Sequence, residues 1–243
     1  MSVVERTSII IGASGLVGSA VARRLIRGGR NVILTSTTEF TSRRAELGDL
    51  SNQIWHAVDV RDESQVSSLF TDPGTGSGRF DVVYCAGMIC DKPIAKLAYD
   101  DWKRVISVNL DGAFLTVRAA FQNMAVRGEG SIVLVSSISA RRAQAGQAAY
   151  AASKAALEAL CRCAAVELGR FNVTCNVVAP GPLSGGMMEH VRPAVKDALV
   201  QRTPLRRLGS AEDAAAAVEF LLGPGARHIT GQTILVDGGF TVT

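Results

Sequence analysis

Ser137, Tyr150 and Lys154 are the side chains whose types and spacing indicate chemistry in this sequence. Tyr150 and Lys154 are four residues apart, so on a helix they share one face, one turn apart. A free phenol has a pKa of about 10 and is a poor base at neutral pH, but a nearby lysine ammonium favours the phenolate and lowers that pKa. Tyr150 could then exchange a proton with an alcohol or a developing alkoxide, and Ser137 could hydrogen-bond the same oxygen. The alternative is a chance Y-x-x-x-K pattern on a helix, because so short a motif is not specific alone.

A strand and a helix are expected to position these side chains. Residues 132–135 form a short, largely β-branched run that is typical of a buried strand, and residues 155–168 have the length and composition of a helix. Ser137 then follows the carboxyl end of a strand. In open α/β sheets this is the edge at which ligands bind.

A glycine-rich turn near the amino terminus indicates a phosphate site. Residues 7–11 predict a strand, and a helix is expected to run from the turn to about Arg27. Glycines let the chain turn tightly and let a pyrophosphate approach the backbone, while the helix amino terminus supplies N–H groups. The alternative is a plain strand-to-helix turn. The candidate cofactor-binding residues of this turn are Gly12, Ser14, Gly15, Leu16, Val17 and Gly18.

Further strands are expected at residues 31–35, 53–58, 81–84 and 172–178. The strand at residues 31–35 ends where the adenosine ribose of a dinucleotide would lie. Thr35, Ser36 and Thr37 offer hydroxyls there instead of the carboxylate that would bind the ribose hydroxyls of NAD, and Arg43 and Arg44 follow soon after. This pattern favours NADP over NAD. The alternative for the two arginines is a solvated helix face.

Residues after the next two strands complete the candidate cofactor site. Asp59, followed by Val60, could accept a hydrogen bond from the adenine amino group, or it could cap a helix that starts near Asp62. Small residues after the strand at 81–84 would let a cofactor lie against the backbone. These residues are Cys85, Ala86 and Gly87.

Asn109 is expected inside one long helix over residues 100–127, among apolar neighbours. A buried asparagine needs hydrogen-bond partners. It could bond backbone groups within its own helix, or it could form a water-bridged link toward Lys154 that relays protons.

Length and composition exclude several classes of protein. The 243 residues are 47% hydrophobic and 20% charged, which is typical of a globular chain rather than a disordered one. No apolar run reaches the roughly 18 residues of a membrane span, and the net charge of +4 comes from dispersed basic residues, so we expect no membrane or nucleic-acid partner. Five cysteines and three histidines show no metal spacing, and no signal peptide is evident, which predicts a cytoplasmic protein with reduced thiols and no metal.

These motifs together resemble the short-chain dehydrogenase/reductase family nearly from end to end. Residues 176–181 and the tail at 229–239 belong to the same pattern. The resemblance implies a single doubly wound Rossmann-type α/β domain over residues 1–243, with a parallel sheet and helices on both faces. It further implies hydride transfer from nicotinamide and, often, a homotetramer.

The resemblance also implies roles for individual residues. Tyr150 would be the acid/base, Lys154 would hold the nicotinamide ribose and tune Tyr150, Ser137 would orient the substrate oxygen, and Asn109 would take part in proton relay. Residues beside the nicotinamide would be Pro180, Gly181 and Leu183.

Within the family the chain is most similar to the β-ketoacyl-carrier-protein reductases, on the segments 35–39, 86–91 and 204–209 and the tail. This similarity implies an NADPH-dependent ketoreductase that reduces a β-ketoacyl group, on a carrier protein or as a CoA thioester, or a polyketide-type ketone. One alternative is an NAD-linked alcohol dehydrogenase that works oxidatively. Another is a dinucleotide-binding regulator that has lost turnover.

Three departures from the family pattern concern the cofactor. The glycines are Gly12, Gly15 and Gly18, with Leu16 in place of the usual middle glycine, and the arginine that often marks NADP in this turn is absent. Tyr84 and Cys85 replace the usual asparagine pair, so a side-chain contact near the cofactor is expected to be lost or replaced.

Two further features suggest how a substrate is held. Residues 184–207, with Gly185, Gly186 and two methionines, are expected to be a lid over an apolar substrate, the alternative being an ordinary surface helix. Arg141 and Arg142 lie between Ser137 and Tyr150, where they could meet an anionic substrate arm such as a phosphopantetheine phosphate, or an acidic carrier protein. They could equally be solvated loop charges.

Overall fold

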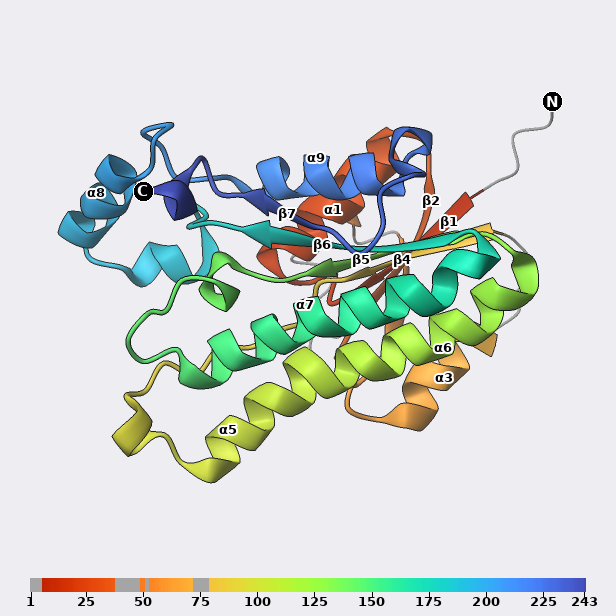
Figure 1. Cartoon of the computed structure of the whole chain (residues 1–243), viewed down its shortest axis with the longest axis horizontal. Helices are drawn as coiled ribbons and strands as arrows, with labels where there is room; N and C mark the ends of the chain where they lie inside the picture. The colour runs from red at the N-terminus through yellow and green to blue at the C-terminus, as the bar shows by residue number, and fades with distance from the viewer. Residues whose placement is uncertain (1–5, 38–48, 51–52, 72–78) are drawn as a thin grey trace.

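A seven-stranded parallel sheet is the centre of the described part of the chain, with the strand order β3-β2-β1-β4-β5-β6-β7 (Figure 1). The computed structural model describes residues 6–37, 49–50, 53–71 and 79–243. The strands are β1 (Arg6–Ile11), β2 (Asn31–Ser36), β3 (Ile54–Ala57), β4 (Arg79–Tyr84), β5 (Gly130–Val135), β6 (Val173–Pro180) and β7 (Thr233–Val236). The chain runs outward from β1 to β3 and then returns to the other side of β1 with β4. The prediction of a doubly wound α/β fold is confirmed.

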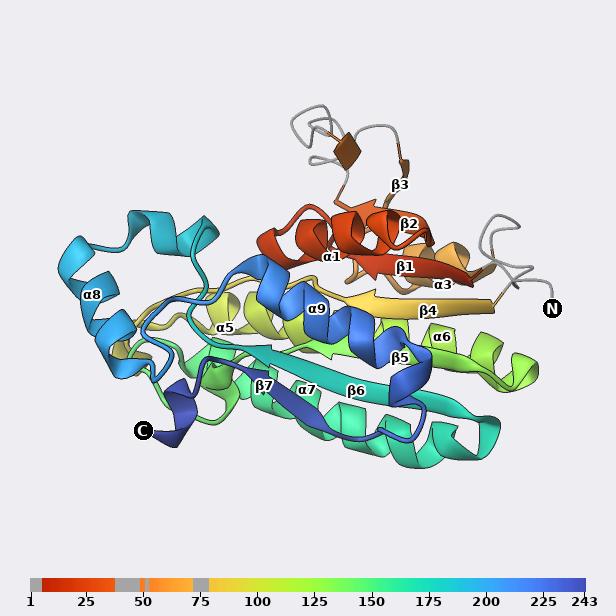
Figure 2. The same ribbon diagram turned by 90° about the horizontal axis from the view of Figure 1, so that it is seen from above.

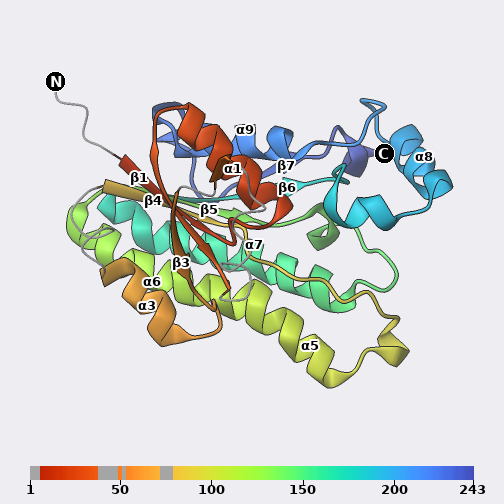
Figure 3. The ribbon, with the colours of Figure 1, turned by 180° about the vertical axis from the view of Figure 1, so that it is seen from behind.

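Helices cover both faces of the sheet. On one face lie α1 (Leu16–Arg27) and α9 (Ala211–Leu222), packed side by side, as the view from above shows (Figure 2). The other face carries α3 (Glu63–Thr71), α6 (Gly112–Arg127) and α7 (Ala148–Leu168), and the same two layers are visible from behind (Figure 3). The remaining α-helices of the described residues are α5 (Tyr99–Ile106), which leads into α6, and α8 (Pro193–Arg202), which lies beyond the carboxyl edge of the sheet.

The apolar core has two halves because side chains alternate across a strand. Ile9 and Ile11 pack on the side of α6 and α7, whereas Ile10 packs on the side of α1 and α9. Strands that are buried on both faces read as continuous apolar runs. The runs in β1 and β5 are therefore the direct signature of this fold.

Two predicted helices differ from the structure in detail. The helix expected over residues 100–127 contains a π-helical turn, η3 (Ser107–Asp111), between α5 and α6. The helix expected from residue 155 begins at Ala148, so Tyr150 and Lys154 both lie inside α7. Across the described residues, no helix combines the length and the apolar character needed to cross a membrane.

Candidate active site

A cleft of 340 Å³ opens at the carboxyl ends of β1, β2, β3 and β4. It lies beside β1, where the strand order reverses direction, and this is the place where doubly wound sheets bind ligands. Eleven of the predicted cofactor-binding residues line the cleft: Gly12, Ser14, Gly15, Thr35, Ser36, Thr37, Asp59, Val60, Cys85, Ala86 and Gly87.

The glycine turn has the backbone form that a phosphate site requires. Gly12 has a φ of +77°, and a Cβ there would lie 2.6 Å from the backbone nitrogen of Ala86. A Cβ on Gly18 would overlap the carbonyl oxygen of Gly12, so this glycine lets α1 pack closely on the turn. Gly15 is the N-cap of α1, with no side-chain cap and no acidic residue in the first turn, which leaves the helix amino terminus suited to an anion. The residues present therefore fit a dinucleotide.

Leu16 does not line the cleft. Its side chain is 40% exposed and lies against the segment that follows β6, because a Cβ on Gly185 would come 3.3 Å from its Cδ1 atom. The next residue, Val17, packs against the apolar core on the α1 side. The residue that replaces the middle glycine thus meets the segment predicted to be a lid.

The end of β2 presents hydroxyl groups, and no described residue between 31 and 37 is acidic. Thr35 Oγ1 accepts a hydrogen bond from the Gly12 nitrogen at 3.4 Å, and Ser36 Oγ donates to Ser14 Oγ at 3.0 Å. These contacts hold the glycine turn against β2. Arg43 and Arg44 lie outside the described residues.

Asp59 is held by Arg61, which the sequence reasoning did not single out. The Arg61 side chain donates to both carboxylate oxygens, from Nε at 2.9 and 3.1 Å and from Nη2 at 2.6 Å. This hydrogen bonding lowers the pKa of Asp59. The alternative role of Asp59 as a helix cap is wrong, because Asp62 Oδ1 accepts the backbone N–H groups of Ser64 and Gln65 at 2.9 and 3.1 Å. Arg61 also lines the cleft.

Tyr84 and Cys85, which replace the usual asparagine pair, have separate environments. Tyr84 is fully buried, and its hydroxyl donates to the carbonyl oxygen of Val108. Cys85 lines the cleft, and burial raises the pKa of its thiol to about 12. A thiol with so high a pKa is a poor nucleophile at neutral pH.

Asn109 lies in the π-helical turn, and its amide reaches outside its own helix. Oδ1 accepts from the Met88 nitrogen at 2.8 Å, while Nδ2 donates to the Met88 oxygen at 3.0 Å and to Ser153 Oγ at 2.9 Å. The expectation that Asn109 bonds backbone groups within its own helix is therefore wrong. Its role in proton relay toward Lys154 stays a prediction.

The residues predicted to be catalytic converge where β5 ends against α7. Ser137 Oγ accepts from the Ser139 nitrogen at 3.2 Å, and the Ser137 side chain is near enough to the Tyr150 hydroxyl to affect its pKa. Lys154 Nζ donates to the carbonyl oxygen of Val135 at 2.8 Å and lies 5.7 Å from the centroid of the Tyr150 ring. Gly87 lies next to both Lys154 and Asn109, since a Cβ there would be in ordinary contact with Lys154 Nζ at 3.4 Å and with Asn109 Oδ1 at 3.5 Å.

Burial dominates the protonation of Tyr150. It raises the pKa of the phenol, although the nearby Ser137 side chain opposes the rise. The negative charge of Asp91 adds to the rise. Burial outweighs any lowering by Lys154, so the pKa of Tyr150 is raised overall rather than lowered as the sequence led us to expect. Lys154 is itself buried, which lowers the pKa of its ammonium to about 8. Tyr150 is a protonated phenol at neutral pH and thus a proton donor.

The predicted nicotinamide-side residues follow β6 at the same edge of the sheet. Pro180 ends the strand, and the nitrogen of Gly181 donates to the Val236 oxygen at 3.0 Å. Leu183 pairs with Gly209 in an isolated bridge. None of the three lines the 340 Å³ cleft, and their contact with nicotinamide stays a prediction.

Arg141 and Arg142 are bound within the molecule rather than left as free loop charges. Arg141 Nη2 lies 3.2 Å from Glu158 Oε2 on α7. Arg142 Nη1 donates to the carbonyl oxygens of Phe240 at 2.8 Å and Thr243 at 2.9 Å. The prediction that these arginines anchor a substrate anion and the alternative that they are solvated loop charges both missed these internal partners.

No cluster of three or more His, Cys, Asp or Glu side chains that could hold a metal occurs among the described residues.

Known proteins resemble this chain over nearly its whole length. A family model described as enoyl-(acyl carrier protein) reductase matches residues 12–241. The chain is 34% identical over 237 residues to the 3-oxoacyl-[acyl-carrier-protein] reductase FabG of Rickettsia conorii, covering 96% of each protein. It is 34% identical to the cis-4-hydroxycyclohexanecarboxylate dehydrogenase of Sinomonas cyclohexanicum, covering 98% of this chain and 97% of that one. The structure of ElxO with NADP bound superposes with a TM-score of 0.88 at 25% identity, covering 99% of this chain and all of that one.

Proposed function

The chain belongs to the short-chain dehydrogenase/reductase family and is an oxidoreductase of hydroxyl and keto groups, and from this premise we propose that it is an NADPH-dependent ketoreductase. Its substrate is a β-ketoacyl thioester, on a carrier protein or on CoA, or a polyketide-type ketone, and its product is the hydroxyl compound. The observation that carries the proposal is the convergence of Ser137, Tyr150 and Lys154 next to Gly87, which lines the cleft.

The cofactor is held by the backbone of the glycine turn and by the cleft that it opens. The N–H groups at the start of α1 bind the pyrophosphate, and Asp59 faces the adenine end. Hydroxyls at the end of β2 in place of a carboxylate favour the 2′-phosphate of NADP, in keeping with the NADP bound by ElxO. Lys154 binds the nicotinamide ribose.

When bound, reduced nicotinamide supplies the hydride that is added to the carbonyl carbon. Tyr150 donates its phenolic proton to the carbonyl oxygen, which develops negative charge as the carbonyl is reduced. The raised pKa of Tyr150 keeps the phenol in the donor form at neutral pH. Ser137 hydrogen-bonds the same oxygen and fixes its position. Asn109 relays the replacement proton through Lys154.

Residues 184–207 cover the substrate. Two observations support this part of the proposal. Gly185 and Gly186 have φ values of +91° and +56°, which side chains rarely adopt, so the segment leaves β6 through a glycine hinge. No residue of α8 is buried, so this helix is available to move toward the edge of the sheet that carries Ser137.

The first test is oxidation of NADPH by a short β-ketoacyl thioester in the wild type and in Tyr150→Phe. We expect the wild type to turn over and the variant to lose at least about 100-fold in kcat, because a general acid contributes on that scale. Tyr99→Phe is the matched control, since Tyr99 is 73% exposed on α5, away from the cleft. Equal turnover by Tyr150→Phe would reject Tyr150 as the proton donor.

An oxidative NAD-linked dehydrogenase is the second candidate, favoured by the likeness to the cis-4-hydroxycyclohexanecarboxylate dehydrogenase. That direction needs the phenolate of Tyr150, which burial disfavours. A kcat/KM for NAD and an alcohol that exceeds that for NADPH and a ketone would favour this candidate. Tight NADPH binding without reduction of any ketone in a broad panel would favour the non-catalytic regulator.

The proposal places the enzyme in the cytoplasm as a homotetramer of single-domain chains. Several large apolar side chains on helices α6 and α7 are exposed, with exposed fractions of 46% for Phe114, 89% for Val126 and 83% for Val166. Exposed apolar side chains of this kind mark surfaces that associate when they form a patch. Light scattering after size-exclusion chromatography measures the mass, and a monomeric mass of 25.6 kDa would reject the tetramer.

A further inference from the structure

Phe240 lies where three separate segments of the chain meet. Its side chain is only 5% exposed. The Cζ atom of Arg142, from the loop between Ser137 and Tyr150, lies 5.1 Å from the centroid of the ring. The Cζ atom of Arg202, the last residue of α8, lies at the same distance of 5.1 Å. The electron-rich ring thus attracts two guanidinium groups that repel each other.

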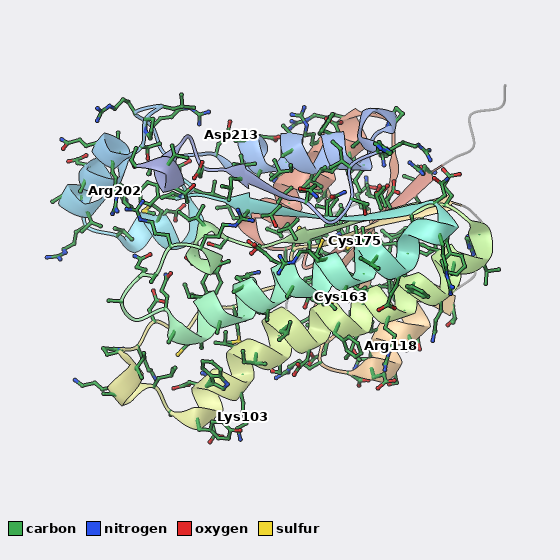
Figure 4. All side chains as sticks on the ribbon, viewed as in Figure 1. Lys103, Arg118, Cys163, Cys175, Arg202 and Asp213 are labelled. Atoms are coloured by element: carbon green, nitrogen blue, oxygen red, sulfur yellow. The ribbon has the colours of Figure 1, made fainter. Side chains whose placement is uncertain are left out.

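Polar contacts reinforce this meeting point. Arg142 donates to two carbonyl oxygens of the carboxyl-terminal turn, those of Phe240 and Thr243. Thr243 Oγ1 in turn donates to the carbonyl oxygen of Arg202 at 3.3 Å. Figure 4 shows Arg202 on α8 beside this turn. The carboxyl-terminal turn therefore joins Arg142 to the end of α8.

The chain after α8 is fastened to the same turn. The nitrogen of Leu205 donates to the Gly238 oxygen at 3.2 Å. Cβ atoms built on Gly238 and Gly239 would lie 2.8 Å from Thr203 Cγ2 and from Pro204 Cγ, respectively, so the two backbones are in close contact. Because α8 itself buries no residue, these contacts at its end help to hold it.

Arg142 is connected to the catalytic hydroxyl through a short rigid turn. The nitrogen of Arg142 donates to the Ile138 oxygen at 2.9 Å, and the nitrogen of Ala140 donates to the Ser137 oxygen at 3.0 Å. The neighbouring Arg141 ties the same turn to α7 through Glu158. The backbone thus provides a short hydrogen-bonded connection from Arg142 to Ser137.

We propose that Phe240 is a positioning residue that, through Arg142 and Arg202, sets the position of α8 relative to the loop that carries Ser137. The inference rests on the proposed function, because it gives α8 the task of covering the ketone. The ring holds the last turn of the covering helix and the catalytic loop at one point. At the other end of the segment, Gly185 and Gly186 contact Leu16 instead of this ring.

The test uses three variants and two readouts. Phe240→Leu removes the ring, Arg202→Met removes one cation at an exposed site where folding is not threatened, and Arg202→Lys restores a cation. Hydrogen–deuterium exchange reports on residues 193–202 and 138–147 without any substrate. Steady-state kinetics report KM for the ketone and kcat, and fluorescence titration reports the Kd for NADPH. Phe171→Leu is the matched control. The Cζ atom of Arg170 lies 4.7 Å from the centroid of the Phe171 ring, in a similar contact at the far end of α7.

Phe240→Leu and Arg202→Met are expected to speed exchange in both segments and to raise KM by roughly three- to ten-fold, the range that a cation–π contact supplies. The Kd for NADPH should stay within about two-fold, and Arg202→Lys and Phe171→Leu should behave as the wild type. Two results would overturn the coupling between α8 and the loop that carries Ser137. One is faster hydrogen–deuterium exchange in residues 193–202 alone, and the other is a lower thermal stability with unchanged exchange in residues 138–147. Unchanged KM in a variant whose exchange has risen in both segments would overturn the link to the substrate. If the wild type reduces no ketone, the proposed function fails. The hydrogen–deuterium exchange of residues 138–147 in Arg202→Met, compared with the wild type, still decides whether α8 and the Ser137 loop are coupled.

Discussion

The hydroxyl of Tyr84 donates a hydrogen bond to the carbonyl oxygen of Val108 at 2.5 Å. Val108 lies in the π-helical turn η3, one residue before Asn109. π-Helical turns are rare and occur mostly at functional sites. Burial raises the pKa of Tyr84, so its hydroxyl remains a donor throughout the physiological range. Tyr84 thus supports the turn from which Asn109 reaches Met88 and Ser153.

Replacing Tyr84 with phenylalanine should lower the free energy of unfolding by about 1–2 kcal/mol, because the buried carbonyl of Val108 loses its donor. It should also lower kcat, since Asn109 is then less firmly placed. Urea unfolding and steady-state kinetics measure the two effects. The exposed Tyr99→Phe should change stability by less than about 0.5 kcal/mol. A Tyr84→Phe protein as stable as the wild type would contradict a supporting role.

Lys154→Met should abolish turnover and yet stabilise the fold at neutral pH. Burial lowers the pKa of the Lys154 ammonium to about 8, whereas an unfolded lysine has a pKa of about 10.4. Because the pKa in the folded protein is lower than in the unfolded chain, burying the charged ammonium destabilises the fold. This destabilisation is complete below about pH 8 and disappears above about pH 10.4. The difference of somewhat more than two pKa units corresponds to a gain in stability of about 3 kcal/mol at pH 7 for Lys154→Met. The loss of the hydrogen bond to Val135 reduces this gain.

Urea unfolding of Lys154→Met and the wild type at about pH 7 and about pH 10 measures this difference. The stability gain should be present at the lower pH and shrink as the pH rises from about 8 to about 10. Lys103→Met is a control on an exposed lysine of α5. A gain that is the same at both pH values would show that lost charge burial is not its cause.

The sequence predicted that the candidate catalytic residues come together because its signals are local. Tyr150 and Lys154 share a helix face, Ser137 follows a strand, and the glycine turn lies between a strand and a helix, so spacing alone places them. The apolar runs that are buried on both faces predicted the parallel sheet in the same way.

Contacts between distant segments could not be predicted from spacing. Arg142 bonds Phe240, 98 residues away, and the sequence around Arg142 contains no sign of that partner. Tyr84 meets Val108 only because β4 packs beneath the π-helical turn, which no sequence pattern marks. Arg61 was overlooked because an arginine after Asp59 and Val60 looks like any surface charge, although its contact with Asp59 spans only two residues. The pKa of Tyr150 was misjudged because spacing gives no measure of burial.

Arg141 and Glu158 should respond unequally to substitution. The Glu158 side chain is 8% exposed, and one of its oxygens has no hydrogen-bond partner among the described residues, so Arg141 provides its compensation. Arg141→Met leaves a buried carboxylate unpaired and should cost about 1–3 kcal/mol of stability. Glu158→Gln keeps an acceptor for Arg141 and should cost less. The double variant should be more stable than Arg141→Met alone, and thermal unfolding of all three tests this order.

Arg141→Met should also lower kcat, because the turn that carries Ser137 loses its tie to α7. Arg104 provides the control, because it is exposed and its partner Asp101 keeps Lys92 as a second partner, so this ion pair should contribute little. If Arg141→Met and Arg104→Met were equally mild in both stability and kcat, the pair at Glu158 would have no positioning role.

Leu16→Ala should free the start of the segment 184–207 while leaving cofactor binding nearly intact. The Leu16 side chain contacts the glycines of this segment and not the cleft, and the helix N–H groups that would bind phosphate are backbone groups. We expect faster tryptic cleavage at Arg192 or Lys196 and a Kd for NADPH within about two-fold of the wild type. Ile94→Ala, at a side chain that is 78% exposed, is the control. A large loss of NADPH affinity with unchanged cleavage would show that Leu16 serves the cofactor instead.

Thr37→Asp should reverse the preference between the two nicotinamide cofactors. Thr37 is exposed and lines the cleft at the end of β2, so the substitution should not disturb the core. A carboxylate there repels the 2′-phosphate of NADPH but accepts hydrogen bonds from the free ribose hydroxyls of NADH. The Kd for NADPH should rise by about ten-fold or more, as one nearby pair of like charges supplies, while that for NADH falls. Thr37→Asn has the same size without the charge and should leave the ratio of the two Kd values nearly unchanged. An equal loss of both cofactors in Thr37→Asp would mean that the 2′-phosphate binds elsewhere, and the assignment of NADPH would then lose its support at β2.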